Sequence, residues 1–187
     1  MITRRMLPNA LLEGNKIPND GNTYLYYLGN ECISNSGGWG YFWHRNDYTN
    51  GVFAKLDDCI YFGDNSPSYG NPMPFCLNFI NFTKYSKIGI DYEISYIKSN
   101  PTYEAFLHLQ FYSVMPVQGA GDNYGTPIEQ IVLYSLKSST ASSKPRNIEI
   151  YDVSSYNSTL SLVLYDFSHA SGSHQVINKL YKLWLEP

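Results

Sequence analysis

The stretch from Lys87 to Lys98, KIGIDYEISYIK, alternates apolar residues with small or polar ones at every second position. In a β-strand successive side chains point to opposite faces, so a period of two predicts a strand with one buried face. The apolar row is Ile88, Ile90, Tyr92, Ile94 and Tyr96, and the other row is Gly89, Asp91, Glu93 and Ser95. No segment keeps helical spacing over three turns, so we expect an all-β fold.

Similar runs follow one another along the chain, separated by turns rich in Gly, Pro, Asn, Asp and Ser. In residues 103–115 we expect Ala105, Leu107, Leu109 and Phe111 to face the core, and His108, Gln110 and Tyr112 to lie on the other face. Strands spaced at roughly ten residues are typical of two packed antiparallel sheets, and we expect a jelly-roll-like sandwich rather than an immunoglobulin domain. The other predicted strands are residues 23–28, 41–45, 52–55, 58–62, 75–80, 129–137, 146–153, 159–167 and 175–186.

The length of 187 residues predicts one domain, which we place at residues 23–187. Residues 1–22 contain two prolines and four asparagines and have no sustained period, so we expect an extended N-terminal arm. An arm of this kind can order on a neighbouring subunit. Its candidate anchoring residues are Arg4, Arg5, Met6 and Leu7.

The composition argues against several classes of partner. Thirteen Lys and Arg against sixteen Asp and Glu give a net charge of -3, whereas nucleic-acid binding needs a basic surface. No apolar run approaches a membrane span, and residues 1–21 lack the apolar stretch of a signal peptide, so we expect neither membrane insertion nor export by such a signal. The three cysteines do not have the spacing of a metal site. We expect them to be free, semi-buried thiols, and a single disulfide between two of them is the alternative.

Catalytic motifs are missing from the sequence: it has no Gly-x-Ser-x-Gly, no His-Glu-x-x-His and no phosphate-binding glycine loop. Asp91 and Glu93 share one face of a predicted strand and are the strongest candidates for a pair of glycosidase carboxylates. We expect that face to be solvated and the carboxylates to be structural. We therefore predict a non-enzymatic protein without a cofactor or metal, and calcium binding by an Asp-rich loop stays an open alternative.

The densest group of binding residues is the segment 37–48, GGWGYFWHRNDY. Aromatic rings flanked by polar side chains can hold a sugar, and the alternative is that the rings are buried in the core. The glycine-rich loop at residues 119–126 could form a second rim, or an ordinary hairpin loop. The candidate glycan-binding residues are Trp39, Tyr41, Trp43, His44, Asp47, Tyr48, Asp122, Asn123 and Tyr124.

Four segments of the sequence resemble β-sandwich modules in structural proteins of bacteriophages and prophages of gut Gram-positive bacteria. They are YLYYLGNECISNSGGWGYF (24–42), INFTKYSKIGIDYEI (80–94), IEIYDVSSYNSTLSLVLYDF (148–167) and INKLYKLWLE (177–186). The resemblance implies a jelly-roll-like module on a virion surface, synthesised in the cytoplasm of the bacterial host.

This resemblance leads us to expect an accessory, decoration or fibre-type subunit that binds capsid or tail proteins through its arm. We also expect a homo-oligomer, with host cell-surface carbohydrate as a candidate ligand. Two alternatives remain open at this stage. One is a bacterial carbohydrate-binding module or lectin-like protein, and the other is a glycan-cleaving enzyme.

Overall fold

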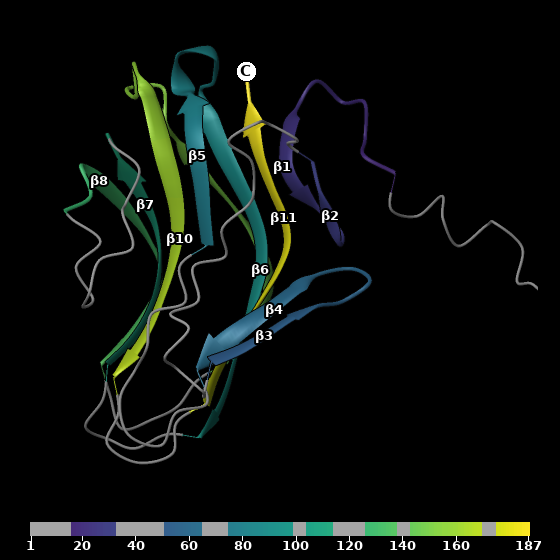
Figure 1. Ribbon diagram of the computed structural model, residues 1–187, viewed down its shortest axis with the longest axis vertical. Helices are drawn as coiled ribbons and strands as arrows, with labels where there is room; N and C mark the ends of the chain where they lie inside the picture. Colours follow the sequence, from purple (N-terminus) through teal and green to yellow (C-terminus); the bar gives the residue numbers. More distant parts are fainter. Residues whose placement is uncertain are drawn as a thin grey trace, which may run out of the picture.

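The computed structural model describes residues 16–32, 51–64, 75–98, 104–113, 126–137, 143–169 and 175–187. Within these ranges the chain forms antiparallel strands in two layers, and contains no α-helix (Figure 1). A short 3-10 helix, η3 (Phe82–Lys84), follows the fifth strand. The strands are β1 (Thr23–Tyr27), β2 (Asn30–Glu31), β3 (Gly51–Lys55), β4 (Ile60–Asp64), β5 (Phe75–Asn81), β6 (Lys87–Lys98), β7 (Glu104–Tyr112), β8 (Glu129–Lys137), β9 (Lys144–Asp152), β10 (Thr159–His169) and β11 (Gln175–Glu186).

The larger sheet, which we call sheet A, is organised around β11. One edge of β11 pairs with β6, and β9 pairs with the far edge of β6. The other edge of β11 is shared, because β4 pairs with residues 176–180 and β1 pairs with residues 182–185. Strands β3 and β2 extend the sheet beyond β4 and β1. The central strand of sheet A is therefore the last strand in the sequence.

The smaller sheet, sheet B, has the order β5-β10-β7-β8. Strand β10 pairs with β7 along its length, and β8 pairs with the other edge of β7. Among the described strands, β8 and β9 are therefore edge strands of opposite sheets, although they follow each other in the sequence.

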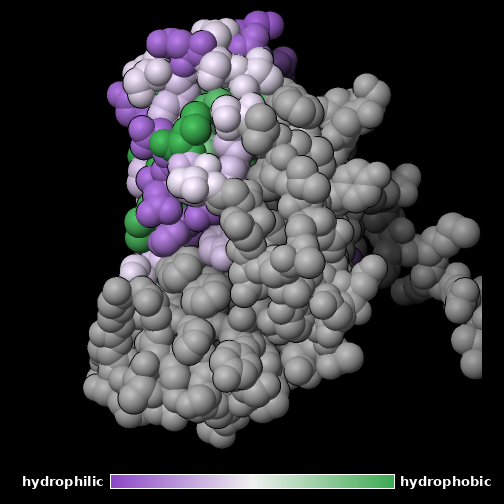
Figure 2. All heavy atoms as spheres, turned by 60° about the vertical axis from the view of Figure 1, so that its left-hand side comes forward, coloured by the Kyte–Doolittle hydropathy of each residue, from purple (hydrophilic) through white to green (hydrophobic). Residues whose placement is uncertain are grey.

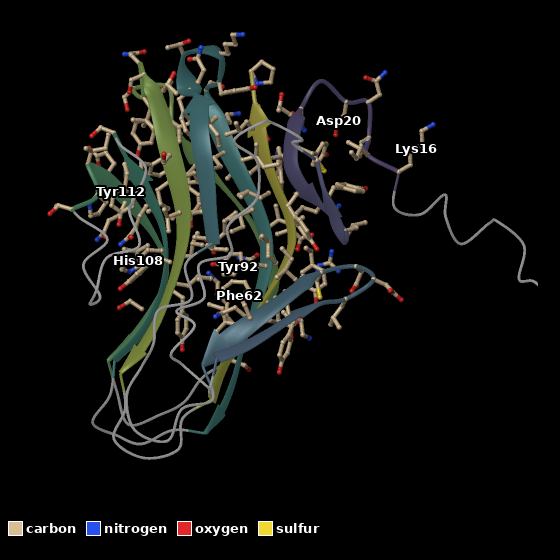
Figure 3. The ribbon with its side chains drawn as sticks, in the orientation of Figure 1. Lys16, Asp20, Phe62, Tyr92, His108 and Tyr112 are labelled. Carbon is tan, nitrogen blue, oxygen red and sulfur yellow. The ribbon has the colours of Figure 1, made fainter. Side chains whose placement is uncertain are left out.

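Apolar side chains from both sheets form one core between the layers. Phe62 of β4 and Tyr92 of β6 mark this interior in Figure 3, and both side chains are buried. The described residues of the row predicted for β6 lie here, since Ile88, Ile90 and Ile94 are fully buried. Burial of these large side chains supplies the main favourable term in folding.

The all-β prediction is confirmed, and the predicted bounds of β6, β8 and β11 match the structure. In β7, Leu107 and Leu109 face the core as expected, while His108 and Tyr112 lie on the opposite face (Figure 3). The strand predicted at residues 41–45 lies outside the described residues.

Strand β9 begins two residues earlier than predicted and includes Pro145. Proline lacks an N–H and is tolerated on an edge strand or at an irregularity. The structure provides both conditions, because β9 is an edge strand and its register with β6 shifts between Tyr92 and Ile94.

Candidate functional site

The residues predicted to bind glycans or neighbouring subunits lie outside the described part of the chain. These are the aromatic segment (Trp39, Tyr41, Trp43, His44, Asp47 and Tyr48), the glycine-rich loop (Asp122, Asn123 and Tyr124) and the arm (Arg4, Arg5, Met6 and Leu7). The two hypotheses that depend on them therefore stay predictions. The structure does describe Asp91 and Glu93, the candidate catalytic carboxylates.

Asp91 lies on the face of β6 that points away from the core, but it is only 1% exposed. Both of its carboxylate oxygens accept hydrogen bonds from Arg146, from Nε at 2.9 Å and from Nη2 at 2.8 Å. The guanidinium carbon of Arg146 lies 3.7 Å from the centre of the Tyr181 ring. Our expectation of a solvated carboxylate is wrong for Asp91, because Arg146 of β9 covers this carboxylate.

Glu93 is bound in the same way by groups of β11. Its Oε1 accepts a hydrogen bond from Lys179 Nζ at 3.0 Å, and its Oε2 accepts one from the Tyr181 hydroxyl at 3.0 Å. Burial first, and then this hydrogen bond, raise the pKa of Tyr181. Tyr181 thus contacts both ion pairs, because its ring packs against Arg146 and its hydroxyl donates to Glu93.

These two ion pairs balance two carboxylates with two cations on the outer face of sheet A. A glycosidase needs one carboxylic acid that can give up a proton and one carboxylate that can reach the sugar or its water. Asp91 is buried, and both of its oxygens are engaged by a guanidinium. This arrangement favours a structural role for Asp91 in joining β6 to β9.

Aromatic side chains continue this outer face toward β1. The indole of Trp184 lies directly over Gly89 of β6, where a Cβ atom would fall 2.1 Å from two ring carbons. Tyr24 packs near Trp184 with 6.3 Å between ring centres and against Tyr27 with 4.9 Å. Lys182 Nζ lies 5.1 Å from the centre of the Tyr27 ring.

Trp184 and Tyr27 are only 7% and 8% exposed. Sugar binding to an aromatic residue needs an accessible ring face, and these two rings are covered by their neighbours. The rings of Trp184 and Tyr27 are therefore too covered to stack on a sugar.

A second polar group, which we call the clasp, joins the two sheets between β8 and β9. It consists of Tyr92, Lys144, Glu149 and Tyr151 with the backbone carbonyl of Leu133. The Tyr92 hydroxyl lies 2.9 Å from the Leu133 carbonyl oxygen and 3.0 Å from Glu149 Oε2. Lys144 Nζ donates to the same carbonyl at 3.1 Å and to Tyr92 and Glu149, and the Tyr151 hydroxyl donates to Glu149.

The charges of the clasp are matched internally. Burial opposes the charged form of Glu149, but hydrogen bonds from Lys144, Tyr151 and Tyr92 outweigh it and lower the pKa of this carboxyl. Burial, followed by interactions with Glu149, raises the pKa of Tyr92 and that of Tyr151. Glu149 is thus an anion and both tyrosines are neutral donors at neutral pH, which suits a fixed cross-link between the layers.

Strand β9 has its apolar residues on the outside. Glu149 and Tyr151 lie opposite Ile90 and Ile88 on the inner side of sheet A, whereas Ile148 and Ile150 lie outside and are 57% and 51% exposed. Few large apolar side chains are so exposed in the described residues. Figure 2 views the molecule from the left-hand side of Figure 1 and shows small hydrophobic areas among hydrophilic atoms.

The sequence analysis identified neither the clasp nor the Arg146 ion pair. A signal was present, because Asn147, Glu149 and Tyr151 alternate with two isoleucines. Burial of the isoleucines would have been the ordinary expectation from hydrophobic periodicity.

A buried amide group lies in the core on β11. Asn178 of β11 is 1% exposed between Phe62 and Ile94, its partners in β4 and β6. Neither its Nδ2 nor its Oδ1 makes a hydrogen bond to any of the described residues. A buried amide of this kind costs free energy, so Asn178 reduces the stability of the fold.

Other site chemistry is limited in the part of the chain that the structure describes. There, no three His, Cys, Asp or Glu residues come together to hold a metal. The same ranges contain no helix with the length and apolar character to cross a membrane. Burial raises the pKa of the Cys32 thiol and of the Cys59 thiol to about 11 each, which leaves both protonated at neutral pH.

Comparison with known proteins finds no family model and no curated protein that matches this chain.

Proposed function

We propose that this chain is a non-enzymatic structural protein of a bacteriophage virion, exposed on the virion surface as an accessory, decoration or fibre-type subunit. The observation that carries the proposal is a two-sheet fold in which the candidate catalytic carboxylates are held in ion pairs. Asp91 and Glu93, the candidate acid and base, are each bound to a cation that ties neighbouring strands together. The resemblance of four sequence segments to phage β-sandwich modules is the basis for proposing a virion.

In this proposal the two sheets form a jelly-roll-like sandwich at residues 23–187, and residues 1–22 are an extended arm. The arm binds a capsid or tail protein through Arg4, Arg5, Met6 and Leu7. The protein is made in the cytoplasm of the bacterial host and reaches the cell exterior with the virion.

The virion assignment is tested by proteomics of purified particles from the source phage or induced prophage. We expect peptides of this chain at a fixed ratio to the major capsid protein, and labelling of intact particles by an antibody against it. Particles that are complete and lack the chain would exclude the proposal. A variant with Arg4 and Arg5 changed to Ser tests the arm, since it should fold normally but be missing from particles.

Glycan binding is the adhesive part of the proposal. It depends on the aromatic segment, because the rings of Trp184 and Tyr27 are covered. A glycan array should give hits with the parent protein, and Trp43→Ala should remove them. Leu56→Ala, which changes an exposed apolar residue elsewhere, is the matched control and should keep the hits. Binding that survives Trp43→Ala would rule out this segment as the ligand platform.

A further inference from the structure

Strand β9 presents an open edge to solvent. Among the described strands it pairs with β6 alone, and none of its nine residues is buried. An edge strand carries a row of backbone N–H and C=O groups that can pair with another strand. Proteins usually block such an edge with bulges, prolines or charges.

The neighbouring edge strand, β8, has such protection. Its register with β7 shifts between Leu107 and His108, and the clasp binds the carbonyl of Leu133. In β9 the proline and the register shift with β6 both lie at the start of the strand, at Lys144 and Pro145. Residues 146–152 remain as a regular strand with the exposed side chains of Ile148 and Ile150 at its centre.

This segment is complementary to itself when read in the antiparallel direction. A twofold axis at Glu149 places Arg146 opposite Asp152 of a second copy, and Ile148 opposite Ile150. Each opposite-charge pair occurs twice, once on either side of the axis. Cross-strand pairs of opposite charge and of β-branched residues stabilise antiparallel strands.

The side chains have the capacity for these contacts. Arg146 uses Nε and Nη2 for Asp91, which leaves Nη1 for an acceptor on another chain. Asp152 accepts hydrogen bonds from Ser154 through Oδ1, and its Oδ2 has no bond among the described residues. The two Glu149 carboxylates would meet at the axis, but each is neutralised by its own Lys144.

We propose that two copies of this chain form a twofold dimer in which the β9 strands pair antiparallel and join the two A sheets into one continuous sheet. Such an interface uses the same surface on both subunits and closes on itself. The inference does not depend on a role in a virion, because it rests on the edge strand alone.

Sedimentation analysis across a range of concentrations tests the dimer. We expect a monomer–dimer equilibrium for the parent protein. Ile150→Lys should raise the dissociation constant at least about tenfold, because it places two positive charges in the apolar strip beside Arg146. Val132→Lys is the matched control, since Val132 is 50% exposed on β8 of the other sheet, and it should leave the equilibrium unchanged.

The register is tested by cysteine cross-linking. Opposed residues of antiparallel strands have Cα atoms about 4.5–5.5 Å apart, a separation that a disulfide can span. A mixture of Ile148→Cys and Ile150→Cys proteins should therefore form cross-linked dimers in mild oxidant, well above the level given by either variant alone. The parent protein measures the background from its own cysteines.

A chain that stays monomeric at all concentrations would overturn the proposal, as would a trimer. So would a dimer that keeps its affinity in the Ile150→Lys variant, or one whose cross-links do not favour the mixed pair. Circular dichroism of each variant confirms that the sheets are retained, so that a lost dimer reports the interface.

Discussion

Replacing Gly89 by alanine should destabilise the protein, although the same change usually helps a strand. Glycine in a strand is about 0.5–1 kcal/mol less favourable than alanine because it loses more conformational freedom on folding. Gly89 does not have a positive φ, so its backbone gives alanine no disadvantage. The obstacle is space, since the new Cβ would lie 2.1 Å from Cε2 and Cζ2 of Trp184 and 2.7 Å from its Nε1.

The magnitude follows from what the indole must do. Turning it away completely would expose an aromatic side chain that buries about 150–250 Å². At about 25 cal/mol per Å² this costs about 4–6 kcal/mol, which is an upper limit. Partial displacement resembles ordinary overpacking, which costs about 1–3 kcal/mol. We therefore expect Gly89→Ala to lower the free energy of unfolding by about 2–4 kcal/mol.

Urea unfolding monitored by circular dichroism measures the change in the free energy of unfolding. Trp184→Leu is the second single variant of a double-mutant cycle. In the Trp184→Leu background the added methyl group has room, so Gly89→Ala should be neutral or stabilise by up to about 1 kcal/mol. The steric argument is refuted if Gly89→Ala is as stable as the parent, or if it costs the same in both backgrounds.

Three further predictions concern the buried polar groups. Arg146→Met should lower the free energy of unfolding in urea by about 3–5 kcal/mol, because it leaves the buried Asp91 carboxylate without its cation. Asp91→Asn should lower it by only about 1–2 kcal/mol, because the half-exposed guanidinium of Arg146 can reach water. Equal losses in the two variants would contradict this account. Asn178→Leu should raise the free energy of unfolding by about 1–3 kcal/mol with an unchanged urea m-value, and a loss of stability would show that the amide has a partner. The lowered pKa of Glu149 means that its contribution is present above its ordinary value of 4.5 and is lost as the pH falls through the lower folded-state pKa. Glu149→Gln should therefore lose less stability than the parent in urea titrations between about pH 6 and about pH 3, and a parallel loss would count against the clasp.

Alternation of residue types was enough to predict most of the strands, since a buried face leaves a period of two in the sequence. It could not predict how the strands pair. Strand β6 was predicted to its last residue, but nothing local shows that its neighbours are β11 and β9. The same reasoning placed Asp91 on the outer face correctly and judged its environment wrongly, because the residue that buries it lies 55 positions away in the sequence.

Strand β9 shows a different limit of sequence reasoning. Its isoleucines alternate like those of β6, yet the inner positions belong to Glu149 and Tyr151. The reason is tertiary: at the margin of the sandwich, Lys144 and Tyr92 offer these polar groups partners that a local pattern does not contain.

The position of β11 has a consequence for biosynthesis. This strand contacts β1, β4 and β6, so sheet A stays incomplete until residues 175–186 have emerged from the ribosome. Chains interrupted before that point would leave the backbone N–H and C=O groups of β1, β4 and β6 without their β11 partners, which makes truncated products ready targets for proteases. We therefore expect sheet A to reach its native pairing only after β11 has been synthesised, and a chain without β11 cannot complete this sheet.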